Sequence, residues 1–250
     1  MTTEPAIWQA IELNNQGSFL IDSLKSEGAI RILNRALELT KQVLDGEKYE
    51  GDQQNLSGHL RPYPIANRFR TTSRRLLICG DNFARTAHEE SSRDHTTDLV
   101  NEPNFYRNPS YYKPEKSSFT EVDKPSTTML SAIIISNLAL AHFLLAGDRQ
   151  EVRSNQGLER SLRLYELAHN ILVNENVASP IHLALVIVNN IAQIHKALGD
   201  DSKAELCLRH LLSTIIYLTD CGCREDVDFI DFFLNSICCL IFKDSCAAAA

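Results

Sequence analysis

The chain has 250 residues, 44% of them hydrophobic, and a formal net charge of -7. This apolar content is enough for a substantial core, and the acidic balance argues against non-specific binding to nucleic acid or anionic lipid. The N-terminus lacks the basic start and apolar stretch of a signal peptide, and an odd count of seven cysteines fits free thiols in a reducing compartment. We therefore expect a cytoplasmic protein, with a nuclear location also open, and no membrane partner.

Residues 6–45 have the spacing of a first helix pair. Large apolar residues recur at helical intervals, and small residues stand where two paired helices would have to approach closely. The first helix carries Leu13, Gln16, Gly17 and Leu20, and the second carries Ala29, Leu33 and Ala36.

Residues 46–128 differ in kind, because they hold six of the eight prolines and keep neither a helical nor a strand period. Such a stretch buries too little apolar surface to offset its ordering entropy, so we expect a low-order insertion. Two alternatives stay open. The insertion is a solvated loop, or a part such as Arg61–Phe69, whose Pro-x-Pro favours extended geometry, folds back along the helices.

Residues 129–215 return to helical spacing and predict a second and a third helix pair. Met129 to Leu145 is the most apolar run, and its polar residues favour a buried core helix over a membrane span. An insertion of about ten residues, 148–157, interrupts the second pair, whereas Gly199 supplies a helix-ending turn in the third. The second pair uses Ile135, Leu138, Ala139, His142, Ser161, Tyr165 and Ala168, and the third uses Val188, Ile191, Ala192, His195, Ala204, Leu208 and Leu211.

An asparagine recurs at the same position in the first helix of each predicted pair, as Asn15, Asn137 and Asn190. The first and third pairs also share a twelve-residue step, from Gly17 to Ala29 and from Ala192 to Ala204. With the doublets Asn14-Asn15 and Asn189-Asn190, this pattern resembles tetratricopeptide (TPR) repeats, such as those of kinesin light chains. The signature of TPR repeats begins with a tryptophan and ends with a proline. In this chain the tryptophan position never holds Trp, and the proline is absent. The resemblance covers about half of the chain. It implies a single all-α domain of antiparallel helix pairs in a right-handed solenoid, packed through Gly17, Ala29, Ala36, Ala139, Tyr165, Ala168, Ala192 and Ala204.

Residues 224–243 form an apolar stripe at helical spacing, centred on Phe229 to Ile241. A helical array needs a cap at its exposed end, so we interpret this stretch as a capping helix. A docking surface for another chain is the alternative.

The resemblance also implies a partner groove lined by the first helix of each pair. Its predicted residues are Asn14, Ser18, Ser136, Leu140, Asn189, Gln193 and Lys196. Only one is basic, which argues against a carboxylate clamp and favours a neutral extended peptide. We predict a non-catalytic adaptor or scaffold that binds a protein or peptide partner, with no cofactor, no metal and no small-molecule substrate. The alternative is a regulatory nucleic-acid-associated protein that uses the basic segment 59–75.

Overall fold

The structure is a computed structural model, and it describes residues 3–54, 105–112, 126–148, 154–174, 181–220 and 230–238. Within these residues the chain is helical apart from short turns and the segment 105–112, and it contains no strand. The helices are α1 (Thr3–Asp22), α2 (Ser26–Gln54), α4 (Thr127–Asp148), α5 (Ser154–Asn174), α6 (Ile181–Ala197), α7 (Asp201–Asp220) and a last helix over residues 230–238. The predicted all-α fold is confirmed.

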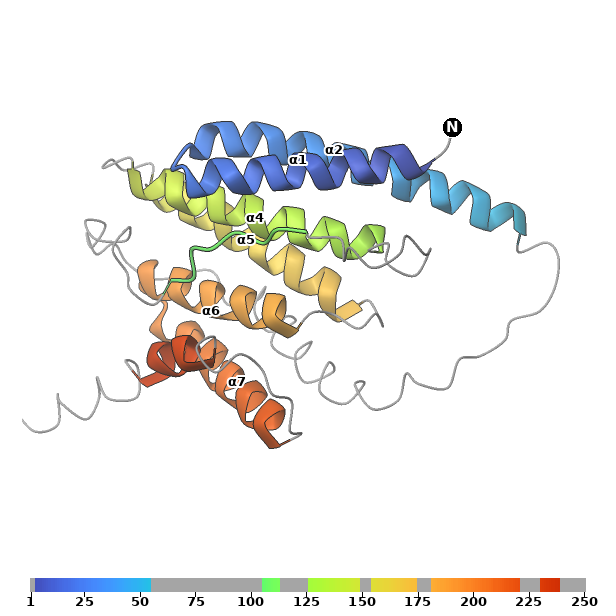
Figure 1. Ribbon diagram of the computed structural model, residues 1–250. Coiled ribbons are helices and arrows are strands. Elements are labelled where there is room, and N and C mark those ends of the chain that lie inside the picture. The colour runs from blue at the N-terminus through green and yellow to red at the C-terminus, as the bar shows by residue number, and fades with distance from the viewer. Residues whose placement is uncertain are drawn as a thin grey trace, which may run out of the picture.

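The helices pack as three successive pairs (Figure 1). α1 packs on α2, α4 on α5, and α6 on α7, while α2 and α1 contact α4 and α5 contacts α6. Turns of only three residues join α1 to α2 and α6 to α7, so these partners run antiparallel. The first helices of the three pairs are therefore α1, α4 and α6, and we call the surface that they share the first-helix face.

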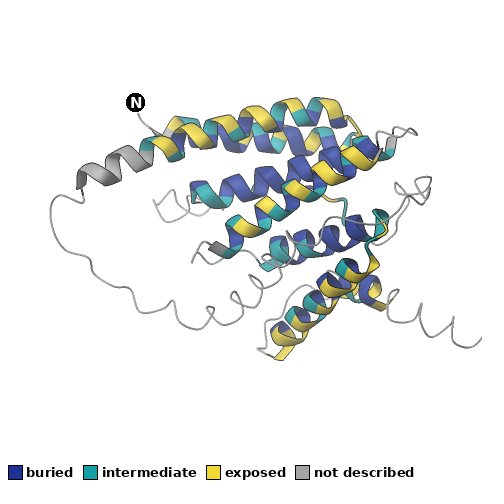
Figure 2. Ribbon diagram, turned by 180° about the vertical axis from the view of Figure 1, so that it is seen from behind, coloured by how far each residue is buried: buried dark blue, intermediate teal, exposed yellow. Residues whose placement is uncertain are grey.

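Helix α4 is the most deeply buried helix of the described residues. From Thr127 to Gly147 it is long and apolar enough to cross a membrane, with a mean hydropathy of 2.0. However, 89% of that stretch is buried inside the protein (Figure 2), between the first pair and α5. The predicted buried core helix over 129–145 is confirmed, and the core position accounts for its composition.

Small residues set how closely the paired helices approach. A Cβ added at Gly17 would lie 2.6 Å from Cγ of Leu33, and one added at Gly157 would lie 2.7 Å from Cβ of Ala146. Neither distance is compatible with a side chain larger than hydrogen unless a neighbour moves. All eight residues predicted to pack the repeats are buried: Gly17, Ala29, Ala36, Ala139, Tyr165, Ala168, Ala192 and Ala204.

The turns after α1 and α6 close in the same way. In each, the residue with positive φ, Leu24 (56°) or Gly199 (80°), is followed by a residue whose N–H reaches back five positions. This is the Schellman arrangement, which satisfies carbonyls left free at a helix end. The bonds are Leu24 N–H to Ile21 O (2.9 Å), Lys25 N–H to Leu20 O (2.8 Å), Gly199 N–H to Lys196 O (3.0 Å) and Asp200 N–H to His195 O (2.8 Å). The first and third pairs are therefore alike in their turns as well as in their spacing.

Three predicted boundaries were wrong. α2 continues to Gln54 instead of ending near 45, because residues 47–54 contain good helix formers and no proline. α4 already begins at Thr127, where the hydroxyl of Ser126 accepts the N–H of Met129 at 3.0 Å as an N-cap. α5 begins at Ser154, so the second pair is joined by residues 149–153 and not by a ten-residue insertion. Of the predicted cap at 224–243, residues 230–238 are helical and the rest lies outside the described residues.

Candidate functional site

Residues 105–112, which read Phe-Tyr-Arg-Asn-Pro-Ser-Tyr-Tyr, lie along the first-helix face. They are the green trace in Figure 1, and they belong to the long stretch between α2 and α4 that was predicted to have little order. We call them the docked segment. The segment forms no helix or strand of its own, and Pro109 disfavours helical geometry at the residue before it.

Three asparagines, one on each first helix, hold the main chain of the docked segment in the same way. Each side-chain amide donates to the carbonyl of one segment residue and accepts the N–H of that same residue. The bonds join Asn15 to Tyr112 (2.9 and 3.0 Å), Asn137 to Ser110 (2.9 and 2.8 Å) and Asn190 to Tyr106 (3.0 and 3.0 Å). We call Asn15, Asn137 and Asn190 the asparagine ladder.

Asparagine suits this task because its side-chain amide has a carbonyl acceptor and an NH₂ donor. These two groups complement the N–H and C=O that each residue presents along an extended chain. A carboxylate could accept but not donate, and a hydroxyl is too small to bridge both groups. The bound residues Tyr106, Ser110 and Tyr112 are all separated by even numbers. In an extended chain such residues direct their main-chain groups to the same side. The ladder therefore reads main-chain geometry and not side-chain identity.

Neighbouring polar groups fix the orientation of the ladder amides. Asn137 Nδ2 also lies 2.9 Å from Oδ1 of Asn14 and 3.1 Å from the hydroxyl of Ser18. Asn14 and Ser18 both donate to the carbonyl of Ser110, at 3.2 and 3.4 Å. Two side chains support Asn190: Asn189 donates to its Oδ1 at 3.2 Å, and the hydroxyl of Tyr165 on α5 accepts from its Nδ2 at 3.0 Å.

Tyr165 lies on the second helix of the middle pair and is 1% exposed. Burial raises the pKa of its hydroxyl well above the ordinary value, so it stays protonated. Asn14 and Asn190 are fully buried as well. Because buried polar groups cost free energy when they lack partners, this network depends on the presence of the docked segment.

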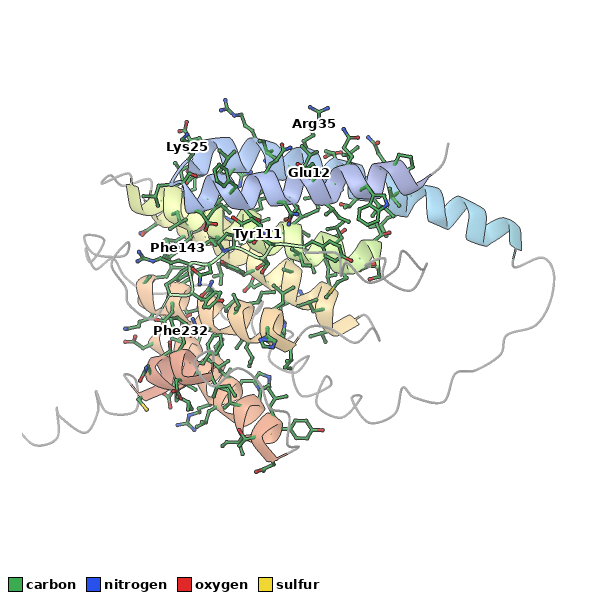
Figure 3. All side chains as sticks on the ribbon, in the orientation of Figure 1. Glu12, Lys25, Arg35, Tyr111, Phe143 and Phe232 are labelled. Atoms are coloured by element: carbon green, nitrogen blue, oxygen red, sulfur yellow. The ribbon has the colours of Figure 1, made fainter. Side chains whose placement is uncertain are left out.

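Aromatic contacts add side-chain selectivity to the main-chain bonds. Phe105 is 3% exposed and stacks on Phe143 of α4, with ring centroids 3.6 Å apart and an interplanar angle of 4°. Tyr106 contacts the last helix, with its ring 5.3 Å from that of Phe232 and 6.1 Å from that of Phe233. Pro109 is also buried. Figure 3 labels Phe143 and Phe232, which meet the segment from α4 and from the last helix.

Tyr111, also labelled in Figure 3, is 40% exposed, and its hydroxyl donates a hydrogen bond to the carboxylate of Asp22 at the end of α1. Burial and the neighbouring carboxylate raise the pKa of Tyr111 to about 12. The two ends of the docked segment thus differ: Phe105 enters the core, whereas Tyr111 stays near the surface.

The seven residues predicted to line a groove lie on these same helices, and the structure gives them different roles. Asn14 and Ser18 contact the docked segment directly, and Asn189 supports Asn190. Ser136, Leu140 and Gln193 are buried on α4 and α6, and Oε1 of Gln193 has no hydrogen-bond partner within the described part of the chain. Lys196 is partly buried near the end of α6.

Sequence reasoning did not identify the asparagine ladder as the binding residues, although the signal was available. Asn15, Asn137 and Asn190 recur at one slot in three copies, and a polar residue kept at equivalent helix positions indicates a repeated task. The segment proposed to dock, Arg61–Phe69, lies outside the described residues, and so does the basic segment 59–75.

The described residues contain no group of three His, Cys, Asp or Glu side chains that could hold a metal ion. Burial lowers the pKa of His142 and of His195 to about 4, so both are neutral rings within the packing at pH 7. A shallow depression of about 420 Å³ is lined by Glu12, Phe19 and Ile32 and by Asn15, the ladder residue that binds Tyr112.

Comparison of the chain with protein-family models, with curated proteins and with solved structures found no match. Function must therefore be inferred from the geometry of this chain.

Proposed function

We propose that this protein is a non-catalytic interaction module, an adaptor or scaffold, whose first-helix face binds an extended peptide segment through its main chain. The observation that carries the proposal is the asparagine ladder: three equivalent side chains, on three successive first helices, each form both hydrogen bonds with one residue of an extended chain. Main-chain pairing supplies affinity, and pockets for alternate side chains supply selectivity, as in other modes of extended-peptide recognition.

The same observations support a TPR-like solenoid as the architecture. The first and third pairs share their turns, the small residues at the slots of the repeat are buried, and the ladder residues occupy one slot in all three pairs. Binding along the concave face of stacked helix pairs is typical of such arrays.

The face is neutral in character, which favours a neutral peptide as partner. Its contacts with the main chain of the segment come from amides and hydroxyls, which offer fixed donors and acceptors without a net charge, and the carboxylate of Asp22 contacts only the hydroxyl of Tyr111. The alternative of a nucleic-acid-associated protein rests on the segment 59–75, for which the described residues supply no geometry.

Site-specific photo-cross-linking tests the proposal. A photoreactive phenylalanine analogue replaces Phe19, which is 65% exposed and borders the depression beside Asn15. The matched control places the same analogue at Leu167, which is 47% exposed on α5. We expect a partner peptide to cross-link from position 19 and not from 167.

Cross-linking from position 19 should also disappear when the three ladder asparagines are replaced by alanine. Partners that are captured only from position 167, or that remain after the triple replacement, would contradict binding through the ladder. Circular dichroism of the triple variant serves as the folding control.

A further inference from the structure

We infer that residues 105–112 are an internal ligand that closes the binding face until a partner with a similar extended segment displaces them. This inference rests on the proposed function and adds to it both the regulation of the site and the chemistry of the partner. It starts from mutual exclusion. The docked segment uses both hydrogen-bonding groups of all three ladder amides, so a partner peptide cannot use them at the same time.

The docked segment is held in a way that suits exchange. Of its eight residues, only Phe105 and Pro109 are buried, and Asn108 and Tyr111 are exposed. The ladder contacts only main-chain atoms, so another extended chain could replace the segment without any change in the ladder itself. The segment belongs to no secondary structure, so its departure breaks no helix.

The contacts also define which partner would compete. The partner must be extended, with free N–H and C=O groups at the positions of Tyr106, Ser110 and Tyr112. It must carry an aromatic ring to stack on Phe143 and a second one to contact Phe232 and Phe233. A proline at the position of Pro109 faces no ladder amide, so its missing N–H loses nothing there, and it favours the extended form. The partner pattern is therefore Phe-Tyr-x-x-Pro-x-x-x, in which the positions of Ser110 and Tyr112 supply only their main-chain groups.

Covalent connection gives the internal segment a large advantage. A tethered ligand acts at an effective concentration in the millimolar range. If a free peptide binds the open face with a dissociation constant of about 10 µM, its apparent affinity for the intact chain would then be about 100-fold lower. Partners that carry a stronger anchor, or that are themselves multivalent, would overcome this competition.

The test measures how a labelled synthetic peptide, residues 103–114 of this chain, binds to the full-length protein by fluorescence anisotropy. The variant Ser110→Pro removes the segment N–H that Asn137 accepts and leaves the helices unchanged. The matched control is Asn108→Ala, at an exposed position of the same segment. The double variant Phe105→Ala/Tyr106→Ala removes the aromatic anchors and provides a second, independent way to open the face.

We expect both opened proteins to bind the peptide at least ten-fold more tightly than wild type and Asn108→Ala. A peptide N-methylated at the residue corresponding to Ser110 should bind none of them well. Equal affinity for opened and wild-type proteins would overturn the inference. If the peptide binds no form while position 19 still cross-links a partner, the internal-ligand inference fails and the proposed function stands. If both binding and cross-linking are absent, the proposed function fails as well.

Discussion

The central amide of the ladder should carry the largest share of segment docking. Replacing Asn137 by alanine removes both hydrogen bonds to Ser110 and the donor to Oδ1 of Asn14, which is fully buried. The carbonyl of Ser110 keeps Asn14 and Ser18 as donors, but its N–H loses its only partner among the bonds described above. Each orphaned buried group costs about 1–3 kcal/mol, so we expect Asn137→Ala to lower the free energy of unfolding by about 2–4 kcal/mol.

Hydrogen exchange measures this loss at the site itself. If docking weakens by about 2 kcal/mol, the amide of Ser110 should exchange about 30-fold faster, because 1.4 kcal/mol corresponds to a factor of ten. The amide of Tyr106, which Asn190 still accepts, should accelerate less. A chain of this size should also lose roughly 5–15 °C in unfolding temperature.

Asn34→Ala is the matched control, because Asn34 is exposed on α2 and alanine is the better helix former. Unchanged exchange at Ser110 in Asn137→Ala would refute the assignment of the ladder, as would an equal loss of stability in Asn34→Ala. A double-mutant cycle with Ser110→Pro should show an interaction energy of at least about 1 kcal/mol, since the two residues share the same bonds.

Three further predictions concern stability and are measured by urea or thermal unfolding. Gly17→Ala should destabilise by about 1–3 kcal/mol, because its Cβ would clash with Leu33, whereas Gly28→Ala, with its nearest contact at 3.4 Å, should be neutral or stabilising. Leu24→Gly should stabilise by about 1 kcal/mol, because φ is 56° there and the side chain is 77% exposed; Leu24→Ala should not. Burial lowers the pKa of His142 to about 4 from an unfolded value of 6.5, so the unfolded state binds more protons between these values and stability should fall as pH drops from about 6.5 to 4. His142→Phe should reduce that slope, to which His169 and His195 also contribute, and an unchanged slope would contradict the prediction.

Much of the fold followed from local patterns that the sequence displays directly. The apolar run of α4 indicated a buried helix, and small residues such as Gly17 and Ala192 indicated close helix packing. Gly199 indicated a turn with positive φ. The turn after α1 was harder to see, because Leu24 occupies the position where Gly199 stands in the third pair. The closing hydrogen bonds tolerate leucine there, at a cost in backbone energy that the sequence does not reveal.

The docked segment could not be located from the sequence, for a physical reason. The ladder contacts main-chain atoms, which every residue possesses. The amino-acid sequence of the segment therefore shows little sign of these contacts. The Pro-x-Pro of Arg61–Phe69 favours extended geometry at least as strongly as the single Pro109, and the docking hypothesis named that segment instead. What distinguishes 105–112 is the position of Phe105 and Tyr106 relative to Phe143 and to the last helix, and this depends on packing across the whole fold.

Because the first-helix face is polar, we expect it to be covered either by an extended segment or by water. Asn14 and Asn190 are fully buried with the segment in place, and their amides are satisfied in part by its main chain. When the segment leaves, these amides must be hydrated, because an unpaired buried amide would cost about 1–3 kcal/mol. An apolar face would bind exposed hydrophobic surfaces without selectivity, and without an occupant it would favour hydrophobic collapse of the helices around it. An amide ladder instead exchanges one set of hydrogen bonds for another, with water or with a second extended chain, so its occupant can change without a large loss of stability.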